Sequence, residues 1–226
     1  MIYEVKIKSM DWTNIVDFNR LKKLVPILNK YALGKLFMAA VKKGIPRDVE
    51  YMLPFVKNNG LQKIIDESLC IAAQNCHVAV MDLLIRNNAN ISYDNNIALR
   101  KAVIEGHEDA VRFLLYYGGD VHTNNDELLL DCCRSGDNSQ VLALLIDHGI
   151  DVFKNYHQAF DICLNLGHNN CISALVRHSD YFPKKEPKLD PDFENYVDFI
   201  IDYDEYHRVC EENENDTDST DLNEDT

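Results

Sequence analysis

The sequence lacks a long apolar run, an excess of positive charge and a closely spaced set of cysteines. No apolar stretch approaches the roughly 20 residues that a membrane helix needs, and Glu4 lies within the first residues, so we expect neither a membrane span nor a secretion signal. The seven cysteines are an odd number scattered along the chain, which indicates reduced thiols in an intracellular protein. The formal net charge of −14 is opposite in sign to that of a general nucleic-acid-binding surface, so we expect no nucleic-acid partner.

The charge is unevenly distributed. Residues 189–226 contain 15 acidic residues and one basic residue, whereas residues 1–188 contain 22 of each sign. Within that neutral part, residues 1–63 contain 12 Lys or Arg against 5 Asp or Glu. The sequence therefore predicts a neutral body with a basic amino end, followed by an acidic tail over 183–226 that is largely disordered, since its last residues are too polar to bury.

A pattern of about 30 residues recurs five times, with its central turn at Gly44, Cys76, Gly106, Gly136 and Gly167. The seventh residue before the turn is Phe37, Leu69, Leu99, Leu129 or Phe160, and the fourth is Ala40, Ala72, Ala102, Cys132 or Cys163. The fifth residue after it is Val49, Met81, Val111, Val141 or Ile172, and the eighth and ninth are Met52-Leu53, Leu84-Ile85, Leu114-Leu115, Leu144-Leu145 or Leu175-Val176.

This spacing predicts two short helices in each repeat, because residues three and four apart share one face of a helix. One such unit cannot bury its apolar side alone, so the units must stack. We therefore predict an all-α helix-turn-helix solenoid of five degenerate repeats with short loops over residues 35–182. Residues 1–34 lack the pattern and are expected to form an N-terminal cap, with an alternating segment at Ile2–Ile7 and a helical pattern that Pro26 interrupts.

The repeat resembles a known family. Gly106-His107, followed by a valine and Leu114-Leu115-x-x-Gly118-Gly119-Asp120-Val121, resembles the ankyrin repeat. The opening Asn95-Asn96-x-Ala98-Leu99-Arg100, and a period near 30 instead of about 33, are similar to the ankyrin proteins of giant amoeba viruses of the mimivirus type. The resemblance implies a non-catalytic protein–protein interaction module, here a viral adaptor for an unidentified host protein. We expect a monomer in the host cytoplasm that binds no cofactor and no membrane.

The predicted partner-binding residues lie just before the turns, on the side that should be concave, and at the tips of the loops. Apolar and aromatic side chains at such places are typical of interface centres, although a solvated face with chance aromatics is the alternative interpretation. The predicted set is Tyr93, Asp94, Ile104, Glu105, His122, Asn124, Arg134, Tyr156 and Leu166.

A metal site is an alternative use of Cys163, His168, Cys171 and His178, which lie within 16 residues of one another. Cys163, however, occupies the small-residue position of its repeat, and His168 follows the turn as His107 does. We therefore expect core packing and turn hydrogen bonds at these positions, and no metal. The sequence has neither a nucleophile at a strand-to-helix elbow nor a glycine-rich phosphate loop, so we expect no enzyme.

Two further functions stay open besides the adaptor. One is a structural or virion-packaged repeat protein without a dedicated partner. The other assigns the activity to the tail, as an acidic decoy for basic proteins. All three interpretations share the same predicted solenoid.

Removal of residues 211–226 should leave the melting temperature unchanged, because a disordered segment contributes nothing to the folded core. Thermal denaturation of the full and shortened chains measures this. A loss of several degrees would contradict the expectation and would indicate docking of the tail on the basic amino end.

Overall fold

The computed structural model describes residues 18–178, except for the side chains of residues 124, 125, 153 and 178. The alternating segment at Ile2–Ile7 and the acidic tail over 183–226 lie outside the described residues. Within the described range the secondary structure is helical, with no strand. None of these helices has both the length and the apolar content that crossing a membrane requires.

Five helix pairs follow one another along the chain. Before them come α2 (Phe18–Leu24) and the short 3-10 helix η2 (Val25–Ile27), and η3 (Phe153–Asn155) precedes the last pair. The pairs are α3 (Lys30–Lys43) with α4 (Pro46–Asn58), α5 (Gln62–Gln74) with α6 (Val78–Arg86), α7 (Tyr93–Ile104) with α8 (Glu108–Tyr116), α9 (Thr123–Ser135) with α10 (Ser139–Asp147), and α11 (Tyr156–Leu166) with α12 (Asn169–His178).

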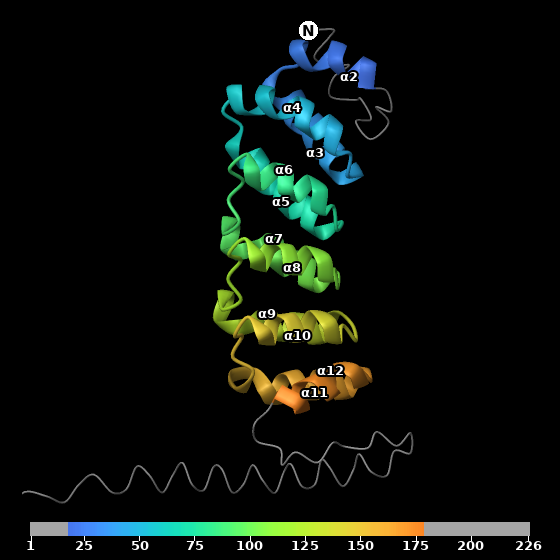
Figure 1. Ribbon diagram of the computed structural model, residues 1–226, viewed down its shortest axis with the longest axis vertical. Helices are drawn as coiled ribbons and strands as arrows, with labels where there is room; N and C mark the ends of the chain where they lie inside the picture. Colours follow the sequence, from blue (N-terminus) through green and yellow to red (C-terminus); the bar gives the residue numbers. More distant parts are fainter. Residues whose placement is uncertain (1–17, 179–226) are drawn as a thin grey trace, which may run out of the picture. The chain divides into compact units, whose positions relative to one another are not determined.

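The pairs stack in two rows (Figure 1). The first helices pack successively as α3, α5, α7, α9 and α11, and the second helices as α4, α6, α8, α10 and α12. Each pair thus covers the apolar side of the pair before it. The predicted all-α solenoid is confirmed.

The repeated apolar positions form the core. All five large residues before the turns, from Phe37 to Phe160, and all five small ones, from Ala40 to Cys163, are buried. The apolar positions after the turns are buried as well, except Ile85, which is half-buried. Small side chains in the first helices let neighbouring helices approach closely, which increases the dispersion contacts between pairs.

Most of the turns that join the helices of a pair use a left-handed residue. The turn residues have φ values of 67° at Gly44, 55° at Cys76, 70° at Gly106 and 72° at Gly167. Glycine adopts this conformation without steric cost, so its use here agrees with the predicted turn. Gly136 differs, because its φ of 164° is extended backbone.

Close approach is a second reason for glycine at two of these turns. A Cβ atom at Gly44 would lie 2.5 Å from the ring of His77, and one at Gly106 would lie 2.7 Å from the side-chain nitrogen of Asn138. In each case the neighbour belongs to the following repeat. The turns therefore contact each other along the stack as well as within each pair.

Residues 18–27 pack against the first pair. Leu21 and Val25 are buried, the rings of Phe18 and Tyr51 meet edge to face at 5.6 Å between centroids, and η2 contacts α4. The predicted helical pattern ends at Leu24, where the 3-10 helix that contains Pro26 begins. These contacts cover one end of the stack with short helical elements.

Leu114 and Leu144 are both buried at equivalent positions, with exposed fractions of 0% and 7%. Leu114→Ala and Leu144→Ala should each lower the free energy of unfolding by about 2–5 kcal/mol, since each leaves a cavity between two pairs. Urea denaturation measures the loss, with Tyr116→Ala as the control, because Tyr116 in α8 is 81% exposed. Losses below about 1 kcal/mol at both leucines would contradict the proposed register.

Candidate protein-binding face

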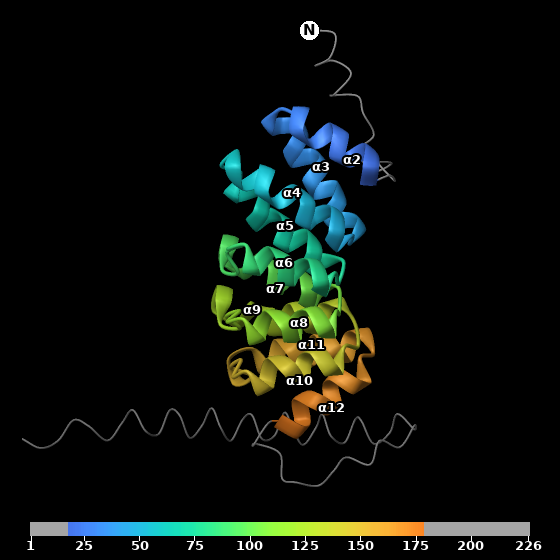
Figure 2. The same ribbon diagram turned by 45° about the horizontal axis from the view of Figure 1, so that its top comes forward.

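The first helices of the pairs lie side by side along the stack (Figure 2), and each of them has exposed residues. We call this surface, formed by α3, α5, α7, α9 and α11, the first-helix face. Ile104 at the end of α7 is 41% exposed, and Leu166 at the end of α11 is 53% exposed. Because packed helices lie 8–10 Å apart, two steps along the row separate these residues by about 16–20 Å. One standard interface, which covers about 800 Å² on each partner, can span both.

A polar network links α5 to α7 on this face. The Lys101 ammonium donates to Gln74 Oε1 at 3.1 Å, and Gln74 Nε2 donates to Glu105 Oε1 at 3.2 Å. Glu105 is exposed as predicted, but one of its oxygens already accepts a hydrogen bond within the chain. Arg134 is also exposed, 3.7 Å from Asp131 in the same helix. Their roles in binding stay predictions.

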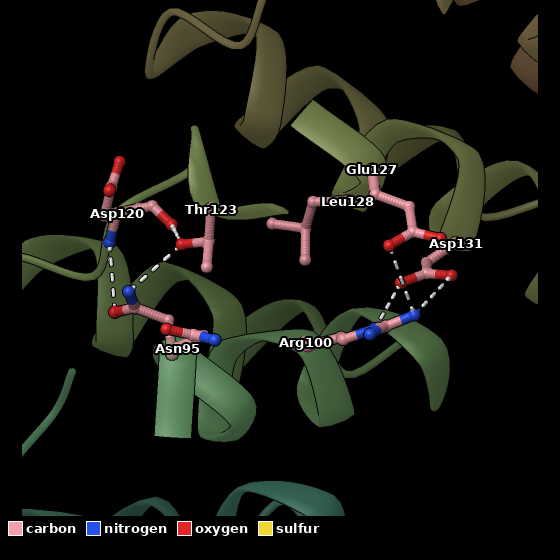
Figure 3. Close-up of a pocket in the computed structure, with 8 residues that line it drawn as sticks. Asn95, Arg100, Asp120, Thr123, Glu127, Leu128 and Asp131 are labelled. Carbon is pink, nitrogen blue, oxygen red and sulfur yellow. Dashed lines mark hydrogen bonds and ion pairs between the residues drawn. The ribbon is translucent and has the colours of Figure 1, made fainter. Parts of the chain in front are cut away.

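Arg100 forms a second junction, between α7 and α9 (Figure 3). Its Nε donates to Asp131 Oδ2 at 2.6 Å, and Glu127 lies 3.8 Å from the guanidinium. Asp131 is buried, and a buried carboxylate needs such a partner. The hollow beside them measures about 10 Å³, room for about one water molecule. This junction therefore links α7 to α9 through an ion pair.

Polar side chains also join the repeats on the loop side. Asp66, Asn96 and Asp126 are buried and occur every 30 residues. The Asn90 amide donates to Asp66 Oδ1 at 2.8 Å, and the Asp120 amide donates to Asn96 Oδ1 at 3.3 Å (Figure 3). Each bond gives a buried side-chain oxygen a hydrogen-bond donor, since an unpaired buried polar group would be costly.

The predicted loop residues differ in their exposure to solvent. Tyr93 is half-buried and Asp94 is exposed, at the start of a left-handed turn in which Asp94, Asn95 and Asn96 have φ values of 48°, 54° and 57°. Asn and Asp tolerate this conformation better than other residues with a side chain, which explains their use here. The side chain of Asn124 lies outside the described residues.

His122 is exposed as predicted, but its ring contacts the buried carboxylate of Asp126 within the chain. Its Nδ1 lies 2.7 Å from Asp126 Oδ1, and the Lys154 ammonium donates to Asp126 Oδ2 at 3.1 Å. Burial acts to raise the pKa of Asp126, but these two hydrogen bonds outweigh it and lower that pKa below its usual value. The charged form of Asp126 is therefore stabilised inside the stack by the His122 ring and the Lys154 ammonium.

Tyr156 was wrongly predicted to be an exposed loop tip. It is 7% exposed, begins α11, and stacks on Phe160 with 6.0 Å between ring centroids. The physical reason is its place in the helix, since Tyr156 lies four residues before the buried Phe160 and shares its side of α11. That spacing was the available signal for its burial.

The part of the chain from α3 into α9 matches a known family. Residues 36–125 fit the family model for ankyrin repeats (3 copies). This part of the chain is therefore similar to three ankyrin repeats. The resemblance read from the Gly106-His107 repeat is thereby confirmed.

Two curated ankyrin-repeat proteins of Acanthamoeba polyphaga mimivirus are similar to this chain. Protein L715 is 37% identical over 86 residues, which are 38% of this chain and 31% of that protein. Protein L675 is 27% identical over 121 residues, which are 54% of this chain and 24% of that protein. The chain thus spans less than a third of the length of these relatives.

The histidines of the ankyrin turns connect neighbouring repeats. His77 Nε2 lies 3.0 Å from the Lys42 carbonyl oxygen, His107 Nε2 lies 3.1 Å from that of Gln74, and His168 Nδ1 lies 2.9 Å from that of Cys133. Each carbonyl lies in the last turn of the preceding first helix, where such groups lack a partner within the helix. The expectation that these histidines bind turn backbone is confirmed.

Asp137 follows the turn of the fourth repeat, at the position where three other repeats have a histidine. The histidines contact the preceding repeat, whereas Asp137 contacts the following one. It accepts hydrogen bonds from the Cys171 amide at 2.8 Å and the Asn170 amide at 3.2 Å, and from Asn170 Nδ2 at 2.7 Å. Although burial acts to raise the pKa of Asp137, these bonds lower it overall. Asp137 therefore caps the start of α12 from another repeat.

Cys70 and Cys163 lie in surroundings that disfavour the thiolate form. Burial raises the pKa of Cys70 to about 11, and a hydrogen bond with Cys133 raises that of Cys163 to about 12. A thiol with such a pKa stays protonated at neutral pH, and the thiolate is the nucleophilic and metal-binding form. Among the described residues, no three His, Cys, Asp or Glu side chains are placed to hold a metal ion. The His178 side chain of the alternative metal site is not described.

Sequence reasoning missed a groove between α3 and α5, which we call the α3–α5 groove. It has a volume of about 420 Å³ and is lined by Lys30, Tyr31, Gly34, Lys35, Met38, Leu61, Ile64 and Glu67. Tyr31, Gly34, Lys35 and Met38 follow one another at spacings of three, one and three residues and so share one side of α3. That spacing indicates the shared side, but the groove itself depends on the approach of α5, which the spacing does not show.

Asp137→Ala should lower the free energy of unfolding at neutral pH by about 0.5–2 kcal/mol, the usual effect of losing a helix cap. Since the folded-state pKa of Asp137 is lowered, its contribution is present above the unfolded value of about 3.9 and is lost as the pH falls through the folded value. Urea denaturation at several pH values should show the wild-type advantage shrinking below about pH 4.

Asp147→Ala is the matched control, since Asp147 is an exposed residue in the last turn of α10. It should change stability little at any pH. Equal effects of the two substitutions, or an Asp137 contribution that grows on acidification, would contradict the capping role.

Proposed function

We propose that this chain is a non-catalytic protein-binding module that acts as an adaptor on a host protein through its first-helix face. Ankyrin repeats in general mediate protein–protein interaction, and the similar mimivirus proteins motivate the choice of a host partner. We place the binding site at the carboxy-terminal ends of α7 and α11, on the basis of the chain's own residues there.

The observation that carries the proposal is the exposure of Ile104 and Leu166. Most exposed residues beside them on this face are polar, and the nearby Gln74, Lys101 and Glu105 bind one another. An exposed Ile or Leu gains free energy when a partner removes it from water, about 1.5–3 kcal/mol for full burial. Two such residues within one interface width supply anchors for a partner.

Two features support a role without catalysis. The buried thiols of Cys70 and Cys163 have raised pKa values, which disfavour the nucleophilic thiolate. The histidines after the turns contact backbone carbonyl oxygens, so the ring nitrogen involved is occupied in a structural bond. These groups serve the stack.

The test replaces Ile104 and Leu166 with Ser together. A partner is first captured with the wild-type chain from a lysate of amoebal host cells and then purified. The double variant should retain its helical circular-dichroism signal, because both side chains are exposed, and should lose about 2 kcal/mol or more of binding free energy. Titration calorimetry measures the affinity. Tyr116→Ser is the control, since Tyr116 is an exposed aromatic residue on the second-helix row.

Other outcomes point to the alternatives. Normal binding by the double variant, together with unfolding on addition of a chelator, would replace this proposal with a metal site at the cysteines and histidines of the last repeat. Absence of a stoichiometric, salt-resistant partner would favour a structural or virion-packaged protein. Loss of capture on deletion of residues 184–226 would favour the acidic decoy.

A further inference from the structure

We propose that the α3–α5 groove binds an acidic peptide segment of a partner protein and takes up one bulky apolar side chain of that segment. This inference rests on the proposed protein-binding function. It adds a second contact site, on the first repeat, and it states the chemistry of the partner there. Charge, shape and exposure each contribute to it.

The groove is open because α3 has a glycine where a side chain would fill it. A Cβ atom at Gly34 would lie 3.5 Å from Ile64 Cδ1, in ordinary van der Waals contact. Met38, Leu61 and Ile64 provide apolar walls around this gap. The volume of about 420 Å³ lies within the range of about 300–1,000 Å³ that is usual for ligand sites. An apolar side chain gains free energy by entering such a space.

The rim of the groove carries positive charge from Lys30 and Lys35. Within residues 18–178, no carboxylate lies within ion-pair distance of Lys30 or Lys35. The carboxylate of the lining, Glu67, lies 3.8 Å from Lys63 Nζ. Tyr31 stands at the rim, 59% exposed, with Lys35 Nζ 5.8 Å from its ring centroid. Carboxylates that flank an apolar residue of a partner would pair with both lysines.

The surrounding residues add to the positive electrostatic potential around the groove. Residues 18–63 contain ten Lys or Arg against two acidic residues. One of those two, Asp48, already pairs with Arg47 at 3.3 Å. Charges separated by more than about 8 Å are largely screened at physiological ionic strength, so this excess speeds the encounter with an acidic segment more than it tightens the final complex.

The lining favours a peptide over a nucleic acid. Single-stranded nucleic acids bind where successive aromatic side chains stack on successive bases, whereas Tyr31 is the one aromatic residue among the groove's lining. Phosphate contacts, in turn, need a charged track and not an apolar cavity. An apolar floor with lysines at its rim matches an apolar side chain flanked by carboxylates.

The experiment uses the full chain and a short fluorescein-labelled peptide of Asp and Glu around one central Phe. Fluorescence anisotropy should show binding that weakens with rising salt. Lys30→Glu combined with Lys35→Glu should reduce the affinity about tenfold or more, and replacement of the peptide's Phe by Ala should reduce it by about the same factor. Circular dichroism verifies that the variant is folded.

The matched control is Lys42→Glu combined with Lys43→Glu, which makes the same change of charge at exposed positions in the last turn of α3. It should change the affinity by no more than about twofold. Equal losses for both pairs of substitutions would overturn the proposal, because the attraction would then belong to the basic end as a whole.

Three other results would also overturn it. These are no measurable peptide binding, tighter binding of single-stranded oligothymidylate than of the peptide, and self-association by sedimentation that the Lys30 and Lys35 substitutions abolish, which would make a second copy the occupant. If the peptide fails while a captured partner still depends on Ile104 and Leu166, the groove assignment alone falls. Normal partner binding by the double variant at Ile104 and Leu166 would instead contradict the proposed function.

Discussion

Burial between neighbouring helix pairs is the constraint on which the rest of this structure depends. Each pair has apolar residues on the sides that face its neighbours, and the first helices contact first helices while the second contact second. Positions such as Leu99 and Leu129 are inaccessible to solvent because the adjacent repeat covers them. The first-helix face follows from this arrangement, since the side of each first helix that stacking does not use is left for other contacts.

Polar groups then fix how each pair sits on the next. Asp66 and Asn96 bind loop amides of the following repeat, His77 and His107 contact helix-end carbonyl oxygens of the preceding one, and Arg100 pairs with the buried Asp131. Such bonds contribute modestly to net stability, but an unpaired buried group would be expensive. They therefore select one register among the sliding arrangements that apolar contact alone would permit.

The core could be predicted from the sequence because its residues repeat, and a repeated position has the same neighbours each time. The burial of Phe37 and Leu114 followed from this rule. Tyr156 was misplaced because it was assigned to a loop tip, although it lies four residues before Phe160 and so shares a helix side with a core residue. The α3–α5 groove could not be read from the periodicity at all, since it depends on Gly34, which departs from the pattern, and on the three-dimensional approach of Ile64.

The direction of the Asp137 bonds makes the last pair a dependent unit. In a linear array a terminal pair has one neighbour and opens more readily than an internal one. Asp137 holds the first amides of α12 from the turn between α9 and α10. Opening of that turn therefore removes the cap from α12, whereas fraying of α12 leaves the backbone of the turn in place. A disturbance between α9 and α10 thus reaches the last described helix through Asp137.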